Sequence, residues 1–259
     1  MISLALVTWN RGAIVAESLC SVLPCPLVTE VVWVDQNSED LEVRLIDETF
    51  DLFPRVLVTR CSLPQNLGAG WGLNRAFALA RNPLVLVTDG DVRLGAGDVD
   101  RMAEILNAKP ERLAVAVYPR EPSTVPERYR GPMFAETIQG PNLDGRGAER
   151  VALARGLPML CNLFKRELLG VAGWMREDFG QCEWNDNEWA ERAMHHASSS
   201  GYDLLAFADR SCVHIPDEDK SREPAAYWDM KVREFEDRTK PARILELAQQ
   251  GYPPFRPFP

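Results

Sequence analysis

The segment LVLVTDGDV at residues 84–92 constrains the fold most, because an apolar run there ends in two carboxylates. Such a continuous apolar, β-branched run predicts a strand that is buried on both faces. Ligands bind at the carboxyl ends of strands in open α/β sheets, which is where Asp89 and Asp91 follow. The two side chains offer hard oxygen ligands for a divalent cation, and Gly90 lets the backbone approach closely. The alternative is a plain Asp-Gly turn.

Strand-like and helix-like patterns alternate along the first 120 residues. Repeated strand–helix–strand units with short links predict an α/β fold: a Rossmann-like, mainly parallel mixed sheet flanked by helices. Further strands and a helix are expected beyond residue 156, and a charged helix with a Pro-rich tail near the end. The expected strands are 2–8, 31–35, 56–59, 84–88, 113–118, 204–208 and 211–215, and the expected helices 14–22, 72–80, 98–106, 185–197 and 224–238.

The composition narrows the functional classes. The chain of 259 residues has a formal net charge of -9, which argues against a general polyanion-binding surface. Its six cysteines show no zinc-like spacing and are expected as free thiols in a reducing compartment. The start MISLALVTWN runs directly into a strand pattern, and no apolar run approaches the about 20 residues of a membrane span. These features predict a cytoplasmic protein without a transmembrane segment.

Other predicted strand ends also carry polar residues. The first ends in Thr8-Trp9-Asn10-Arg11 and the second in Asp35-Gln36-Asn37-Ser38. Glycines at 68, 70 and 72 precede a predicted helix, where anions and hydroxyl groups bind readily. A dinucleotide fingerprint and a phosphate-binding P-loop are both missing from the sequence. The pattern therefore points to a mononucleotide or nucleotide-sugar site.

Four segments, in this order, resemble the nucleotide-sugar domain of family 2 glycosyltransferases with the GT-A fold: VTWNR, VVWVDQNS, NLGAGWGLNRAFALA and LVTDGDV. The resemblance covers residues 1–95. It implies that Thr8 and Asn10 lie against the nucleotide and that Asp35 binds the base or ribose. The full donor-binding set that it implies is Thr8, Asn10, Arg11, Asp35, Asn37, Asn66, Gly68, Asn74, Arg75, Asp89 and Gly90.

The same resemblance implies a cofactor, Mn²⁺ or Mg²⁺. Asp89 and Asp91 match the Asp-x-Asp pair of the family, with Asp91 the firmer ligand. In several relatives a histidine in the region of His214 completes the metal site, and an imidazole ligand would tilt the preference toward Mn²⁺. The alternative is a structural histidine.

A later segment, FGQCEWNDNEWAERA, resembles the acidic pair that precedes a helix in the family. Asp186 fits the general base, because a carboxylate at a helix N-terminus stays ionised. The first acidic partner is replaced by Asn185, which makes Glu183 the fallback. Trp184 is a candidate for stacking on a sugar ring. The alternative is that Asp186 merely caps the helix.

These observations predict a metal-dependent glycosyltransferase that moves a sugar from a UDP- or GDP-linked donor to an acceptor hydroxyl. Asp186 as base predicts inversion, and retention stays open. The other interpretations are a sugar-phosphate nucleotidyltransferase and a non-catalytic nucleotide-sugar-binding protein. We expect a catalytic domain at 1–215 and an extension at 216–259.

The acceptor is not specified by the sequence. An irregular, arginine-rich region at 119–155 lies on the expected acceptor side and suits an anionic acceptor. A glycan, a lipid-linked or small molecule, or, less favoured, a modified nucleic acid would fit. The alternative is that these arginines pair with neighbouring glutamates. The sequence makes no prediction of oligomeric state.

Overall fold

The computed structural model describes residues 1–119, 151–153, 161–177, 185–209 and 212–215, and the single positions 229, 233 and 246. Several expectations lie outside these residues. They are most of the acceptor-side region 119–155, the helix at 224–238, the Pro-rich tail, and the two side-chain candidates Glu183 and Trp184. The extension at 216–259 is therefore not tested by the structure.

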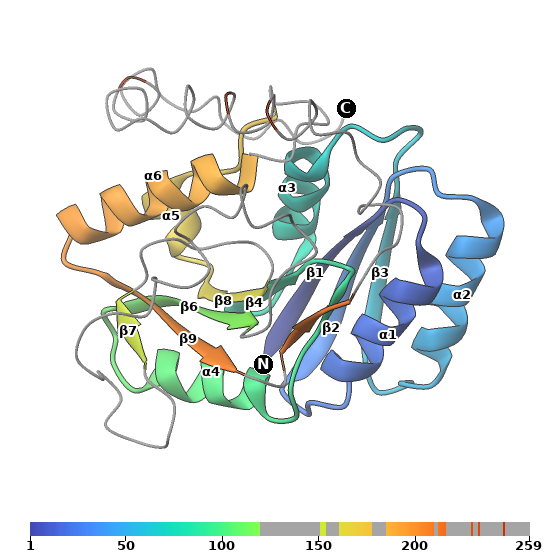
Figure 1. Cartoon of the computed structure of the whole chain (residues 1–259), viewed down its shortest axis with the longest axis horizontal. Helices are drawn as coiled ribbons and strands as arrows, with labels where there is room; N and C mark the ends of the chain where they lie inside the picture. The colour runs from blue at the N-terminus through green and yellow to red at the C-terminus, as the bar shows by residue number, and fades with distance from the viewer. Residues whose placement is uncertain are drawn as a thin grey trace.

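One mixed sheet forms the centre of the molecule, with strand order β3-β2-β1-β4-β8-β6-β9-β7 (Figure 1). Strands β1, β2, β3 and β4 run parallel, and β6 is parallel to β9. Strand β8 is antiparallel to both β4 and β6, and β7 is antiparallel to β9. The bounds are β1 Ile2–Thr8, β2 Val28–Asp35, β3 Leu57–Ser62, β4 Leu84–Thr88, β6 Arg112–Pro119, β7 Ala152–Leu153, β8 Cys161–Lys165 and β9 Asp203–Asp209.

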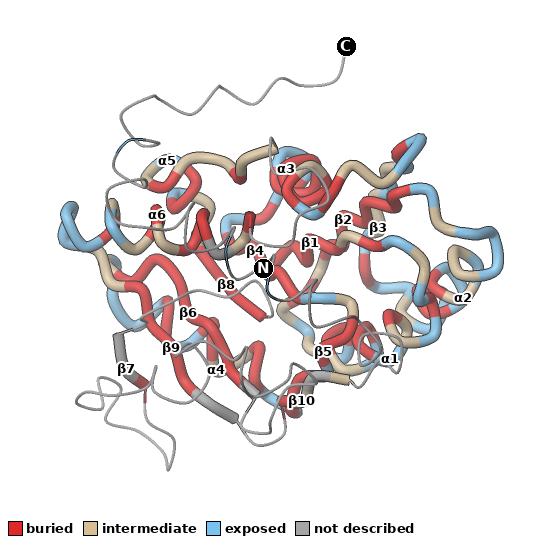
Figure 2. The backbone as a smooth tube through the Cα atoms, turned by 45° about the horizontal axis from the view of Figure 1, so that its top comes forward, coloured by how far each residue is buried: buried red, intermediate tan, exposed pale blue. Residues whose placement is uncertain are grey.

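Helices cover both faces of this sheet. Helices α1 (Gly12–Val22), α2 (Asp40–Asp51) and α4 (Asp98–Asn107) pack on one face, in a core cluster with Val15, Phe50 and Met102. Helices α3 (Ala69–Leu79), α5 (Leu168–Ala172) and α6 (Asn185–Ser199) pack on the other, in a cluster with Phe77 and Trp189. Figure 2 shows the buried sheet between the two helical layers. This is the three-layer arrangement expected of an α/β domain.

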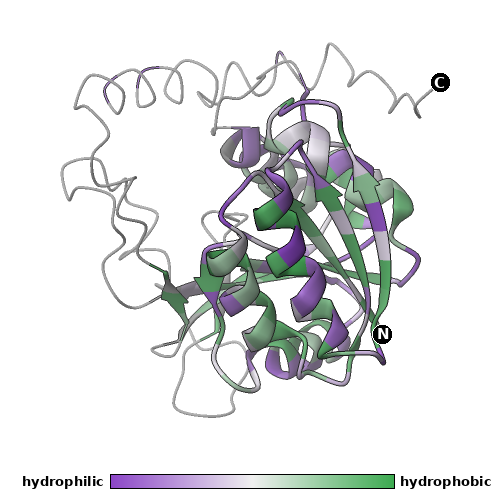
Figure 3. Ribbon diagram, turned by 90° about the vertical axis from the view of Figure 1, so that its right-hand side faces the viewer, coloured by the Kyte–Doolittle hydropathy of each residue, from purple (hydrophilic) through white to green (hydrophobic). Residues whose placement is uncertain are grey.

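The alternation of side chains along β1 explains how one strand serves both layers. Ile2, Leu4 and Leu6 belong to the core under α1, whereas Ala5 belongs to the core under α3. Both sets are apolar, so the middle of the strand is hydrophobic on both faces, and most of the strand surface in Figure 3 is coloured as hydrophobic. Gly72 lets α3 approach closely, because a Cβ there would lie 2.4 Å from Cγ1 of Val7.

The predicted α/β fold is confirmed, and the structure corrects its details. The predicted helix at 72–80 begins earlier, at Ala69. Helix α4 begins at Asp98, as expected; its N-cap position is Gly97, and the Asp98 carboxylate accepts a hydrogen bond from the Gly95 N–H at 2.8 Å. Asp98 thus closes the turn before the helix. Helices α2 and α5 and strand β8 are absent from the predicted elements. Helix α5 and strand β8 have five residues each and are too short to show a period, whereas α2 does carry a helical spacing, at Val43, Ile46 and Phe50, that the prediction missed.

Candidate functional site

The carboxyl ends of β1 and β2 place Thr8 directly beside Asp35. The Thr8 hydroxyl donates to Oδ1 of Asp35 at 3.3 Å and accepts from Nε1 of Trp33 at 2.8 Å. Both polar residues are buried, and Oδ2 of Asp35 accepts from the Ser38 N–H at 3.3 Å. The structure therefore brings together two of the predicted nucleotide-side residues and fixes their side chains.

The two loops that follow these strands are interlocked. The Asn10 N–H donates to the Ser38 hydroxyl at 2.7 Å, and the Glu39 N–H donates to Oδ1 of Asn10 at 3.0 Å. Asn10, Arg11 and Asn37 have positive φ angles of 58°, 61° and 66°. Such backbone is uncommon outside glycine and concentrates at functional sites, where the surrounding structure holds it in place. Three predicted donor-binding residues thus lie on strained backbone at this edge.

The Asp89-Gly90-Asp91 segment follows β4 at the same edge, because β4 is parallel to β1. It is indeed a turn, since the Val92 N–H donates to the Asp89 carbonyl at 3.2 Å. Asp89 is exposed, whereas Asp91 is only 5% exposed. Nη1 of Arg11 lies 3.9 Å from Oδ2 of Asp91. The turn and the cation-site interpretations are therefore compatible: the turn presents both carboxylates beside the Arg11 loop.

The segment containing His214 runs alongside this turn. Strand β10 (Val213–His214) pairs with β5 (Val92–Arg93), so that His214 is opposite Val92, and the Ile215 N–H donates to the Asp91 carbonyl at 2.6 Å. The backbone of His214 is thus next to Asp91, as the predicted metal site requires; its side chain is not among those described. Within the described ranges, no three His, Cys, Asp or Glu side chains gather as a metal cluster.

The donor set that is present fits a hard divalent cation. Asp89 and Asp91 supply carboxylate oxygens, which Mg²⁺ and Mn²⁺ prefer, and such ions keep several further ligands from water or substrate phosphates. Burial raises the pKa of Cys161, at the start of β8, well above its usual value, which favours the protonated thiol.

The loop before α3 is tied to the end of β2. Oε1 of Gln36 accepts from the Leu67 N–H at 3.0 Å, and Oδ1 of Asn66 accepts from the Gly68 N–H at 2.9 Å. Gly68 has a φ of 95°, which a side chain would disfavour. Asn66 and Gly68 therefore shape this loop, whatever else they bind. Gln36 is not among the predicted site residues, although it lies in the motif with Asp35.

Asn74 and Arg75 make contacts different from the predicted ones. The Asn74 amide donates to the Met175 carbonyl at 2.8 Å and accepts from the Met175 N–H at 3.0 Å. Nη1 of Arg75 lies 2.9 Å from Oε1 of Glu177, and Nδ2 of Asn74 donates to the same oxygen at 3.0 Å. Both residues thus hold α3 against the segment after α5, and their contact with a donor stays a prediction.

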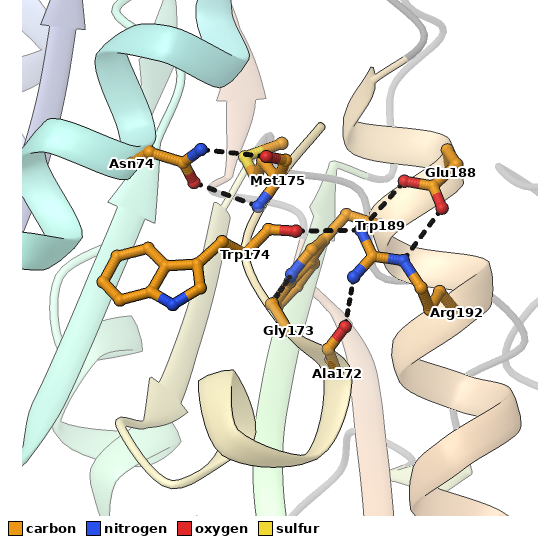
Figure 4. A network of polar contacts seen from close by, with 8 residues as sticks. All are labelled: Asn74, Ala172, Gly173, Trp174, Met175, Glu188, Trp189 and Arg192. Carbon is orange, nitrogen blue, oxygen red and sulfur yellow. Dashed lines mark hydrogen bonds and ion pairs between the residues drawn. The ribbon is translucent and has the colours of Figure 1, made fainter. Parts of the chain in front are cut away.

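Helix α6 is fastened to the same segment by what we name the α6 clamp: Glu188, Trp189 and Arg192 with the backbone of residues 172–174 (Figure 4). Arg192 donates to both carboxylate oxygens of Glu188, at 2.8 and 3.0 Å, and to the carbonyls of Ala172 and Trp174. Nε1 of Trp189 donates to the Gly173 carbonyl at 2.8 Å. All three clamp side chains are buried. The clamp fixes the position of the helix that carries Asp186.

The first turn of α6 abuts the first turn of α3. A Cβ on Gly70 would lie 2.7 Å from Nδ2 of Asn185 and 2.6 Å from the Arg176 carbonyl oxygen, so only glycine allows this approach. Asp186 is half-buried in the same turn of α6. The candidate base therefore lies at the edge of the sheet where the strand-end residues gather, at a helix N-terminus that favours its ionised form.

Comparison with known proteins agrees with this geometry. The chain matches the model of glycosyl transferase family 2 over residues 3–170. It belongs to glycosyltransferase family 2. A search of curated proteins found no match. Among the residues that the structure describes, no helix is long and apolar enough to cross a membrane.

Solved structures share the fold of this family 2 chain at low sequence identity. The mannosyltransferase PcManGT from Pyrobaculum calidifontis, in complex with GDP-Man and Mn²⁺, has a TM-score of 0.64 at 19% identity. The match covers 98% of this chain but 65% of that one. S. aureus TarS in complex with UDP-GlcNAc has a TM-score of 0.57 at 14% identity, and the match covers 92% of this chain and 72% of that one. GalNAc-T7 with UDP, GalNAc and Mn²⁺ has a TM-score of 0.61 at 10% identity, and the match covers 83% of this chain and 44% of that one.

Proposed function

We propose that this protein transfers a sugar from a UDP- or GDP-linked donor to an acceptor hydroxyl, with a divalent cation. The observation that carries the proposal is the meeting of three parallel strand ends, which places Thr8 and Asp35 at one edge with the Asp89–Asp91 turn. Polar groups at such an edge suit a nucleotide, and two carboxylates beside it suit a cation that bridges to phosphate.

Each group at this edge has a separate role. Asp35, held by Thr8 and the Ser38 N–H, accepts hydrogen bonds from the base or ribose of the donor. Asp91 and Asp89 would hold Mn²⁺ or Mg²⁺, and a cation bound there neutralises the diphosphate as it leaves. Arg11, beside Asp91, adds a fixed positive charge for the same phosphates. Donor binding and leaving-group stabilisation thus share one edge of the sheet.

Asp186 serves as the general base. It takes the proton of the acceptor hydroxyl while that oxygen forms a bond to the anomeric carbon, and the bond from this carbon to the diphosphate oxygen breaks. One displacement of this kind inverts the anomeric configuration. The α6 clamp supports the role, because it fixes the helix on which Asp186 lies.

Similar structures support a nucleotide-sugar donor without choosing one. PcManGT is described with GDP-Man and TarS with UDP-GlcNAc, so both nucleotides suit this fold. We propose that the acceptor approaches from the side of the arginine-rich region 119–155 and is anionic, because that region gathers six arginines, which can pair with an anion, in a chain whose formal net charge is -9.

Hydrolysis of the donor tests the proposal without knowledge of the acceptor. A panel of UDP- and GDP-sugars is incubated with the protein and Mn²⁺, Mg²⁺ or EDTA, and release of UDP or GDP is measured. We expect release from one donor class, only with metal, and a loss of about 100-fold or more in Asp91→Asn. Asp47→Asn is the control, since that carboxylate is half-exposed and pairs with Arg60. Equal release by Asp91→Asn and wild type would refute the proposal.

A further inference from the structure

Two buried asparagines, Asn162 and Asn185, have side-chain amides without hydrogen-bond partners among the described residues. Within the part of the chain that the structure describes, both polar side-chain atoms of Asn162 and of Asn185 lack a hydrogen-bond partner. Asn162 is 0% exposed and Asn185 is 1% exposed. Buried amides are almost always paired, since an unpaired one loses its hydrogen bonds to water without compensation. Two such residues indicate missing partners.

The strand register places Asn162 close to the Asp89–Asp91 turn. Asn162 lies on β8, opposite Val87 on one side and Ala116 on the other. Its neighbour Cys161 is opposite Thr88, the last residue of β4 before the Asp89–Asp91 turn. Because side chains alternate along a strand, Asn162 shares a face with Phe164, two residues on. That face carries the core cluster of α3, α5 and α6.

Asn185 lies over the same face and toward the same edge. It is one helical turn before Trp189, whose ring lies 5.7 Å from the ring of Phe164. Its Nδ2 lies against Gly70 in the first turn of α3, which begins at the carboxyl edge of the sheet. Asn162 is closer to that edge than Phe164, because β8 runs antiparallel to β4. The two unpaired amides are therefore on the same side of the sheet and near the same edge.

We propose that Asn162 and Asn185 bind the hydroxyl groups of the donor's sugar ring and so determine which sugar is accepted. This inference rests on the proposed function. The sugar is attached to the diphosphate that the Asp89–Asp91 turn would hold, and it must also lie within reach of Asp186, which follows Asn185. Asn162 lies beside the end of β4, which leads into this turn, and Asn185 immediately precedes Asp186 on α6. Each amide can donate and accept, as each sugar hydroxyl can, and neither carries a charge.

A sugar-binding role also explains why the amides of Asn162 and Asn185 are unpaired in the protein without a donor. The ligand supplies the missing partners, so the ligand-free protein is less stable than it would be with apolar residues at these positions. Binding sites commonly carry such a cost. A site built to bond a hydroxyl also rejects analogues that lack it, because the buried amide would again be left unpaired. Asn162 and Asn185 would therefore favour a fully hydroxylated sugar over its deoxy analogue.

Binding measurements separate a sugar contact from a nucleotide contact. Dissociation constants of UDP, GDP and the corresponding nucleotide sugars are measured with Mn²⁺ for wild type, Asn162→Leu and Asn185→Leu. We expect each variant to bind the free diphosphate within about twofold of wild type and the nucleotide sugar at least about tenfold more weakly. Asn162→Ala and Asn185→Ala repeat the test with smaller side chains, in case leucine does not fit.

Thermal stability gives a second test, because replacing an asparagine with a structural role would lower the melting temperature, whereas replacing an unpaired one would raise it. Asn162→Leu should raise the melting temperature of the ligand-free protein, because an unpaired amide is replaced by apolar atoms. Asn74→Leu is the matched control: this asparagine is equally buried but bonded to Met175 and Glu177, and its loss should lower the melting temperature. A fall for both variants would show that Asn162 has internal partners and would overturn the inference.

The outcomes distinguish this inference from the proposed function. If wild type binds neither a nucleoside diphosphate nor a nucleotide sugar, the proposed function fails. If wild type binds both and the variants weaken both equally, or neither, the proposed function stands and the assignment of the two asparagines is wrong.

Discussion

Two regions of the molecule position candidate site residues and are built in opposite ways. The first, which we call the rim, comprises residues 8–11, 35–38 and 89–91. Its polar groups are held by short loops with positive φ angles, and Asp89 is exposed. The second is the α6 clamp, in which buried Arg192 is bonded to Glu188 and to two backbone carbonyls. The rim presents groups for a ligand, whereas the clamp uses its polar groups to hold a helix.

The difference predicts separate effects of substitutions. Changes in the clamp should lower the free energy of unfolding and leave nucleotide affinity almost unchanged. Changes at Arg11, Asp89 and Asp91 in the rim should lower nucleotide affinity and leave stability almost unchanged. A variant that violates this separation would show that the two regions are energetically coupled.

The largest stability effect is expected for Arg192→Met. It leaves the Glu188 carboxylate, which is 0% exposed, without its cation, and breaking a buried pair in this way costs about 3–5 kcal/mol. Chemical denaturation of the variant measures the loss. The double variant Glu188→Leu with Arg192→Met should recover more than half of it, because no buried charge remains. Arg93→Met is the control: its pair with Glu17 is exposed, and we expect a change within about 0.5 kcal/mol.

A smaller loss is expected for Gly70→Ala, where the first turns of α3 and α6 meet. The new Cβ would lie 2.6 Å from a backbone oxygen that cannot move freely, and overpacking of this kind costs about 1–3 kcal/mol. Gly170→Ala is the matched helical control, since a Cβ at that position would have open space around it, with no neighbouring atom within 4 Å. Replacing glycine by alanine there should be neutral or stabilising, by up to about 1 kcal/mol. Equal destabilisation of both variants would contradict the close approach of the two helices.

The smallest stability effect is expected in the rim, for Arg11→Gly. Arg11 has a φ of 61° and caps α1, a position that glycine tolerates well, so the free energy of unfolding should change by about 1 kcal/mol or less. Affinity for UDP or GDP with Mn²⁺ should fall about tenfold, because a charged contact to phosphate is lost. Calorimetric titration and a denaturation curve measure both quantities. Unchanged affinity would show that Arg11 does not contact the phosphates of the nucleotide.

The sequence predicts the rim better than the clamp, for a physical reason. Thr8 and Asp35 are the last residues of buried strands, and Asp91 lies in the turn just after β4, so strand order alone predicts that they share an edge. The clamp depends on contacts between separate segments, such as Arg192 with the carbonyls of Ala172 and Trp174, and no local pattern specifies these partners. Asn74 and Arg75 likewise contact Met175 and Glu177, partners that no local pattern specifies, and their predicted donor contacts stay predictions. The helix at 185–197 is predicted because its period is a local pattern, and the structure contains it as α6.

The central claim is that the Asp89–Asp91 turn holds a cation that binds the donor's diphosphate. The most direct test is calorimetric titration of UDP and GDP into wild type and Asp91→Asn, with Mn²⁺ and with EDTA. We predict that one nucleotide binds to wild type only when Mn²⁺ is present, and that Asp91→Asn weakens this binding at least about tenfold while the melting temperature of the ligand-free protein stays within a few degrees. Binding of equal strength with EDTA, or in Asp91→Asn, would contradict the claim.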